Sequence, residues 1–294
     1  MNFTTHQNRR WSLFGLWFAG SIAVFWKAFD SLVRYSFGND DASHILLIPI
    51  ISAWLIFTDR RPVFKQLSYD AALGVSLLIP GVVCLLWALR SAPASPSACA
   101  LGLVLLWISG FALIFGRPAT KNARFALLFL FLFIPLPEVL LNRVVYWLQK
   151  GSAEIADILF GLTPLPVLRD GFIFHLPRFS IEVARECSGI RSSIALLVLA
   201  ILLGHFFLPQ FWKQAVFVVA GMVVMIIKNG IRIVTLTLLA SYVDPAFLYG
   251  NLHREGGVVF FMIGLLLLLP VFWLLQRGEP PAHGSPVKTP ASAA

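Results

Sequence analysis

Residues 181–207 read IEVARECSGIRSSIALLVLAILLGHFF and decide the class of the protein. At the start, apolar Ile181 and Val183 alternate with polar Glu182, a pattern typical of a strand. From Ile190 an apolar run begins that is long enough to cross a membrane, so we expect a helix over about 189–207. Cys187 lies at the junction, where a polar strand-like segment meets a membrane-length helix.

Composition extends this interpretation to the whole chain. Of 294 residues, 58% are hydrophobic and 13% charged, and the mean hydropathy is +0.82. Arginines and lysines flanking membrane spans explain the net charge of +9 better than nucleic-acid binding does. We predict an all-α integral membrane protein with one polytopic domain over 1–275 and a disordered cytoplasmic tail over 276–294. About eight transmembrane helices are expected, near 11–29, 43–57, 71–89, 98–115, 125–135, 189–207, 214–242 and 257–275.

Charge in the short loops predicts the orientation. The leader and the loops at 59–69 and 117–124 are rich in Arg and Lys, whereas the loop at 30–43 carries Asp30, Asp40 and Asp41. Basic loops face the cytoplasm, so we expect both termini inside a multi-pass protein of the cell (inner) membrane. Residues 136–187 then form an extracytoplasmic insert.

This insert has its own expected structure. Residues 139–160 predict an amphipathic helix that lies on the membrane surface, with a re-entrant hairpin as the alternative. Asp170-Gly171 is a strong hairpin signal between two short apolar runs. An alternating segment at 179–183 predicts a third strand. We therefore expect a small β-cap that leads to Cys187.

The position of Cys187 favours its thiolate. The N-terminal end of a helix offers unpaired N–H groups and a positive dipole end, and Arg191 follows one turn later on the same face. Both stabilise the form of cysteine that attacks carbonyls; the alternative is a small buried residue. Cys84 and Cys99 lie in apolar runs, where cysteine behaves as a hydrophobe. No Cys/His spacing resembles a zinc site, so no metal or cofactor is expected.

Arg232 is the second candidate. It lies about 18 residues into its span, roughly 27 Å along the axis, near the outer boundary and level with Cys187. Snorkelling to the outer headgroups is the alternative explanation. Three histidines can reach the same side, namely His44, His175 and His253. A thiolate, an acid–base histidine and a cation are what acyl transfer from a peptide requires.

Two noncatalytic interpretations remain open. In a transporter or lipid-handling protein, Arg232 and Lys228 would bind substrate or headgroups in a charged cavity. A noncatalytic subunit that packs against partner helices would show no dependence on Cys187. Neither interpretation gives a reason for a cysteine at a helix end.

Three motifs resemble the exosortase/archaeosortase family of membrane proteins. They are EVARECSGIRS at 182–192, NGIRI at 229–233 and HREGGVVF at 253–260. Asp41-Ala42-Ser43-His44 resembles a further family motif near the second span, although Ile45 replaces its glycine. The likeness covers about residues 40–275.

The resemblance implies a cysteine protease or transpeptidase with Cys187 as nucleophile, Arg232 as stabilising cation and His253 as acid–base group. A separate hypothesis is that Asp244 or Glu255 orients His253; the alternative for each is a solvated loop carboxylate. Substrates would be secreted proteins whose C-terminal signal combines a short motif (Pro-Glu-Pro in many bacterial members), a transmembrane helix and a basic cluster. Cleavage just outside the membrane would give a thioester that water or another acceptor resolves. Family members are often linked to exopolysaccharide production, so a polysaccharide-export role is the corresponding noncatalytic alternative. The implied supporting residues are His44, Glu182, Arg191 and Asn229.

Overall fold

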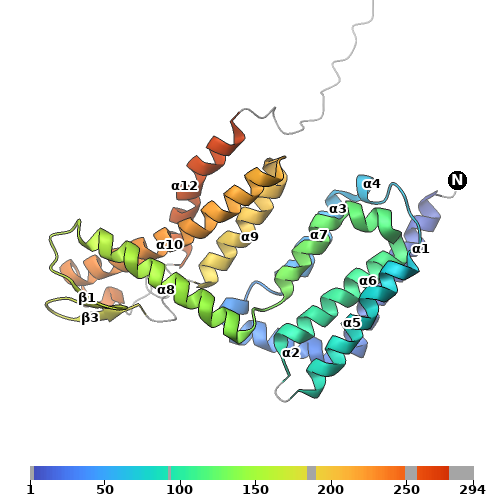
Figure 1. Ribbon diagram of the computed structural model, residues 1–294, viewed down its shortest axis with the longest axis horizontal. Coiled ribbons are helices and arrows are strands. Elements are labelled where there is room, and N and C mark those ends of the chain that lie inside the picture. Colours follow the sequence, from blue (N-terminus) through green and yellow to red (C-terminus); the bar gives the residue numbers. More distant parts are fainter. Residues whose placement is uncertain (1–2, 92–93, 184–189, 249–256, 278–294) are drawn as a thin grey trace, which may run out of the picture. The chain divides into compact units, whose positions relative to one another are not determined.

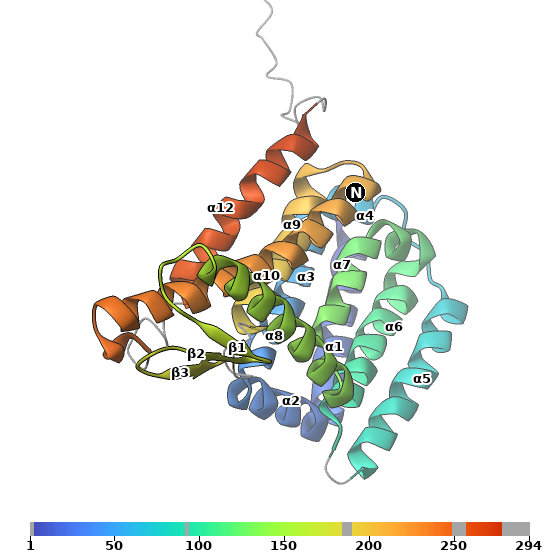
Figure 2. The ribbon, with the colours of Figure 1, turned by 60° about the vertical axis from the view of Figure 1, so that its left-hand side comes forward.

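The computed structural model describes residues 3–91, 94–183, 190–248 and 257–277. The chain divides into two compact units, residues 1–142 and 143–294. In the described ranges most of the chain is helical, and a single small sheet lies in the second unit (Figure 1). Figure 2 shows the same elements from another side.

The first unit is a set of helices and short 3-10 turns. Helices α1 and α2 meet at an angle of 81°, so the span expected over 11–29 breaks at Phe25. Helices α5 and α6 come later in this unit, and each is long enough to cross a membrane. The elements of the unit are α1 (Phe3–Val24), α2 (Trp26–Gly38), η1 (Asp40–Ala42), α3 (Leu47–Thr58), α4 (Arg60–Val63), α5 (Ala71–Arg90), α6 (Pro96–Asn122), α7 (Arg124–Phe129) and η2 (Leu130–Phe133).

Small residues allow α5 and α6 to approach closely. A Cβ atom added at Gly102 would lie 2.5 Å from Leu85 Cγ and 2.9 Å from the carbonyl oxygen of Gly81. Lipid tails are as apolar as leucine, so membrane helices associate through close packing at small residues rather than by the hydrophobic effect. The two helices of this pair are therefore held by backbone proximity.

Aromatic rings fill the core on the other face of α6. The ring centroids of Phe111 and Phe115 are 4.8 Å apart, and Phe64 lies 4.9 Å from Phe115. Trp11 and Phe14 of α1 pack on the same cluster at 5.3 and 5.7 Å from Phe115. Tilted and edge-on ring pairs at these separations are the favoured arrangement of aromatic side chains.

Glycine and proline cause two of the bends. Gly116 has φ 83°, and an added Cβ there would collide with Ser68, so the kink in α6 requires glycine. Pro135 and Pro137 follow η2, where the chain turns by 90° into α8 (Glu138–Phe160). Proline lacks the N–H that a continuing helix would use, so a straight span over 125–160 is excluded.

The second unit contains three membrane-type helices. These are α9 (Ile190–Phe207), α10 (Phe211–Tyr242) and α12 (Gly257–Gln276), with a short turn η4 (Pro245–Leu248) after α10. Leu196 of α9, Phe217 and Val224 of α10 and Leu268 of α12 belong to one buried cluster. The long helix predicted over 214–242 is confirmed as α10.

The predicted β-cap is also confirmed. Strands β1 (Leu168–Asp170), β2 (Ile173–His175) and β3 (Ser180–Glu182) form an antiparallel sheet in that order. Gly171 has φ 60°, as the turn after Asp170 requires. Phe174 is fully buried and packs on Phe160 of α8 at a centroid distance of 5.3 Å.

The all-α membrane class is confirmed, and helix lengths support five to seven spans against the eight expected. Five described helices are long and apolar enough to cross a membrane, and each of two bent pairs can supply one more. The run expected over 43–57 gives only the 12-residue helix α3, about 18 Å long. The transmembrane helix expected over 125–135 is divided between α7 and η2. The predicted tail lies outside the described ranges from 278 onward.

Candidate active site

Helix α10 presents a cluster of polar residues in the second unit. Lys228 and Asn229 are each 1% exposed, and Arg232 follows Lys228 by one turn and is half-buried. Residues four apart lie on the same face of a helix, and the charges of Lys228 and Arg232 interact. Charged side chains at this depth in an apolar helix usually serve function.

Asn229 connects α10 to α8. Its side-chain amide donates to Ser152 Oγ at 3.0 Å in a buried contact. One residue on, a Cβ at Gly230 would lie 2.5 Å from Ile155, so the backbones of α8 and α10 are in close contact there. Asn229 is thus a structural support of the helix that carries Arg232.

Lys228 connects α10 to the start of α9. Its Nζ donates to Ser192 Oγ at 2.6 Å, and Ser192 lies in the first turn of α9. The sequence marks Lys228 as an interruption of an apolar run and, in the transporter interpretation, as a binding residue. Its partner is 36 residues away, so no local pattern could have identified Ser192.

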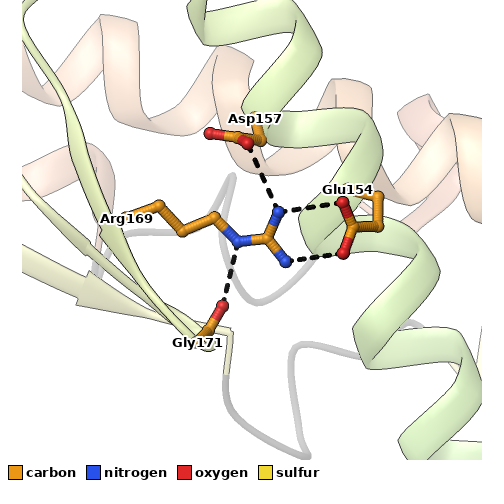
Figure 3. A network of polar contacts seen from close by, with 4 residues as sticks. All are labelled: Glu154, Asp157, Arg169 and Gly171. Atoms are coloured by element: carbon orange, nitrogen blue, oxygen red, sulfur yellow. Dashed lines mark hydrogen bonds and ion pairs between the residues drawn. The ribbon is translucent and has the colours of Figure 1, made fainter.

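The β-cap is fixed on α8 by an arginine and two carboxylates (Figure 3). Arg169 donates from two nitrogens to both oxygens of Glu154, at 2.9 and 3.0 Å, and one of those nitrogens also donates to Asp157 at 3.3 Å. The hydrogen bond from Arg169 lowers the pKa of the Glu154 carboxyl, and the same bond raises the pKa of Arg169. A bidentate pair of this kind sets direction as well as energy, so it fixes how the hairpin lies on the helix.

Hydrogen bonds to α8 and to the Phe172 carbonyl hold the end of the strand that leads to Cys187. Gln149 of α8 donates from Nε2 to the carbonyl oxygen of Val183 at 2.9 Å, and the Val183 N–H bonds to the Phe172 carbonyl. Val183 is 1% exposed. The six residues 184–189 therefore connect two fixed points, Val183 on α8 and the first turn of α9 on α10.

Cys187 and His253, the predicted nucleophile and acid–base group, lie outside the described residues, as does Glu255. Asp244 accepts a hydrogen bond from the Ala246 N–H at 2.7 Å, capping η4. His175, one of the three histidine candidates, pairs through Nδ1 with Ser180 Oγ at 2.9 Å across β2 and β3. These assignments remain predictions.

The predicted supporting residues occupy different places. Glu182 is exposed on β3, and Arg191 is exposed at the start of α9. His44 belongs to the first unit, in the turn before α3, where its ring hydrogen-bonds the backbone of Leu132 and Asp41. Burial lowers the pKa of His44, the largest of the effects on it. Of the four, the structure brings Asn229 next to Arg232 along α10.

Among the described residues, no group of three or more His, Cys, Asp or Glu side chains could hold a metal ion.

Comparison with known proteins assigns the family. The model described as Transmembrane exosortase (Exosortase_EpsH) matches residues 9–270. The chain belongs to the transmembrane exosortase family. The resemblance predicted from the three motifs is thereby confirmed, and with the apolar helices it makes the chain a multi-pass membrane protein of a sorting-enzyme family. No curated protein and no solved structure matches the chain.

Proposed function

We propose that this exosortase is a cysteine protease or transpeptidase that cleaves C-terminal sorting signals of secreted proteins at the outer face of the membrane. Cys187 is the nucleophile, Arg232 the stabilising cation and His253 the acid–base group. The observation that carries the proposal is the attachment of the described residues on both sides of 184–189. Gln149 of α8 bonds Val183 before that segment, Lys228 of α10 bonds Ser192 after it, and α10 also carries Arg232.

The reaction has two steps. The Cys187 thiolate attacks the carbonyl carbon of the scissile peptide bond, and Arg232 stabilises the negative charge on the carbonyl oxygen. His253 gives a proton to the leaving amine as the carbon–nitrogen bond breaks, which leaves a thioester on Cys187. Water or an amine then attacks the thioester and loses its proton to His253, and the sulfur of Cys187 leaves as the thiolate, which restores the starting state.

The substrate follows from the site and the family. A secreted protein would present a short motif of the Pro-Glu-Pro kind above the membrane, followed by a transmembrane helix and a basic cluster. The helix would reach the enzyme within the bilayer, and the β-cap fixed by Arg169 would lie beside the motif. With both termini cytoplasmic, the positive-inside pattern puts residues 136–187 on the outer side.

A processing assay in membranes tests this proposal. A tagged reporter with the three-part signal is co-expressed with wild type, Cys187→Ala, Cys187→Ser and His253→Ala, at matched protein levels. We expect cleavage by wild type, none by either Cys187 variant, and a thioester-linked species on Cys187 detectable by mass spectrometry.

A second cysteine of the chain, Cys84, supplies the control for the Cys187 variants. Cys84→Ala removes a thiol of the first unit that donates to the Ala98 carbonyl at 3.3 Å, so it should leave cleavage unchanged. Cleavage at the wild-type rate by Cys187→Ala would exclude the enzyme mechanism and favour a transporter with a charged cavity.

A further inference from the structure

Lys228 is the buried cation for which the reaction gives no role. A lysine of 1% exposure in an apolar helix loses hydration that one hydroxyl cannot replace. Among the residues that the structure describes, no carboxylate forms an ion pair with Lys228. A methionine or leucine would fill the same space without that desolvation, so packing alone does not explain the charge.

The side chain of Lys228 lies where three helices meet. Its Nζ reaches Ser192 of α9 at 2.6 Å. A Cβ added at Gly264 of α12 would lie 3.4 Å from its Cδ. These are the helices that follow Cys187 and His253 in the chain, and α10 itself carries Arg232.

Chain length limits the distance to the cysteine. Ser192 lies five positions after Cys187, and an extended chain covers at most about 18 Å over that interval. In a medium of low effective dielectric constant, a unit charge within that range changes the energy of an anion appreciably.

We propose that Lys228 is a positioning residue of the site: through Ser192 it fixes the first turn of α9 on α10, and it adds a second positive charge beside Arg232. The inference rests on the proposed function, in which Cys187 reacts as a thiolate. A positive charge on α10 then favours that anion and the oxyanion that follows.

The test measures local potential rather than activity. In full-length protein with Cys84→Ala and Cys99→Ala, Cys187 is the remaining cysteine of the three. Its alkylation rates with anionic iodoacetate and neutral iodoacetamide are compared in membranes. A change in access alters both rates together, whereas a change in local charge alters their ratio.

Lys228→Met should lower the iodoacetate to iodoacetamide ratio about threefold or more. Lys228→Arg, which keeps the charge, should preserve the ratio even if both rates fall. Lys213→Met is the matched control, because Lys213 is also buried and lies on α10, 15 residues away. That variant should leave the ratio unchanged.

An unchanged ratio in Lys228→Met would overturn the inference. If that variant fails to accumulate, Ser192→Ala replaces it: loss of the hydroxyl releases the ammonium, and an unchanged ratio there has the same meaning. Because alkylation needs no substrate, this result is separate from the processing assay. Cleavage by Cys187→Ala would overturn the proposed function, whereas the alkylation ratio would still report the charge that Lys228 contributes.

Discussion

Helices α6 and α10 are the longest of their units, and they bury different kinds of residue. The buried face of α6 consists of apolar residues, glycines and Ser109, whose hydroxyl donates to the Gly74 carbonyl at 2.8 Å. Helix α10 buries four polar residues with its apolar ones, namely Lys213, Lys228, Asn229 and Thr237. The first helix serves packing. The second keeps polar groups where packing gives no reason for them.

The polar contacts of the two units differ in the charge of the groups involved. In the first unit, Trp17 Nε1 donates to the Leu106 carbonyl and Ser52 Oγ to the Ala126 carbonyl, and Trp107 Nε1 of α6 donates to Ser21 Oγ of α1, so these contacts join neutral groups of different helices. In the second unit, Lys228 and Asn229 bond to side chains of other helices. Buried polar side chains are costly unless they are satisfied, so Lys228 and Asn229 depend on these partners.

The largest effect is expected at Arg232. Arg232→Met should lower reporter processing by about 10²-fold or more, the usual cost of losing an oxyanion-stabilising group, while membrane insertion stays normal. Arg117→Met on α6 is the control, because that arginine is exposed. Rates come from quantitative blots of precursor and product. Equal losses of reporter processing in the two variants would contradict a functional difference between α10 and α6.

The next largest effect is on stability, and it belongs to α6. Phe111 is fully buried between Phe14, Phe64 and Phe115. Phe111→Ala should cost about 3 kcal/mol of unfolding free energy through lost packing. Phe37→Ala, at a residue that is 82% exposed, should cost little. Thermal unfolding in detergent measures both, and similar midpoints would contradict the predicted role of the aromatic core.

Two glycines on α10 give a smaller, graded effect. An added Cβ lies 2.5 Å from Ile155 at Gly230 but 3.3 Å from Ala200 at Gly221. Gly230→Ala should therefore separate α8 from α10 and cost about 1–3 kcal/mol by overpacking, whereas Gly221→Ala should be tolerated. Crosslinking yield between cysteines placed at 152 and 229 reports the separation. A greater loss of crosslinking yield in Gly221→Ala than in Gly230→Ala would contradict the packing argument.

Local patterns predicted much of this fold. The hairpin at Asp170-Gly171 and helices α8, α9 and α10 follow from turn chemistry and apolar periodicity, which need only neighbouring residues. The break at Phe25 was missed because neither proline nor glycine marks it. Ser192 and Ser152 were missed because they lie 36 and 77 residues from their partners on α10. The roles predicted for Cys187 and His253 lie outside the described residues and remain predictions.

Acid should loosen the two units in different pH ranges. Burial lowers the pKa of His44 from its usual 6.5, so the folded first unit holds fewer protons than the unfolded chain below that pH. Its contribution is complete above about pH 6.5 and is lost as pH falls through the lowered pKa. Arg169 lowers the pKa of Glu154 from its usual 4.5, so the attachment of the β-cap weakens only below about pH 4.5.

Hydrogen exchange of peptides covering 40–47 and 168–182, corrected for intrinsic rates, separates the two ranges. Between about pH 7 and 5 the first peptide should lose protection while the second keeps it. His44→Gln should remove the acid sensitivity of the first, and Arg169→Met that of the second, because each variant removes one member of the titrating contact. Loss of protection by both peptides in one pH range would mean that a single group controls them. That result would contradict the assignment of the two pH ranges to His44 and to the Arg169–Glu154 contact.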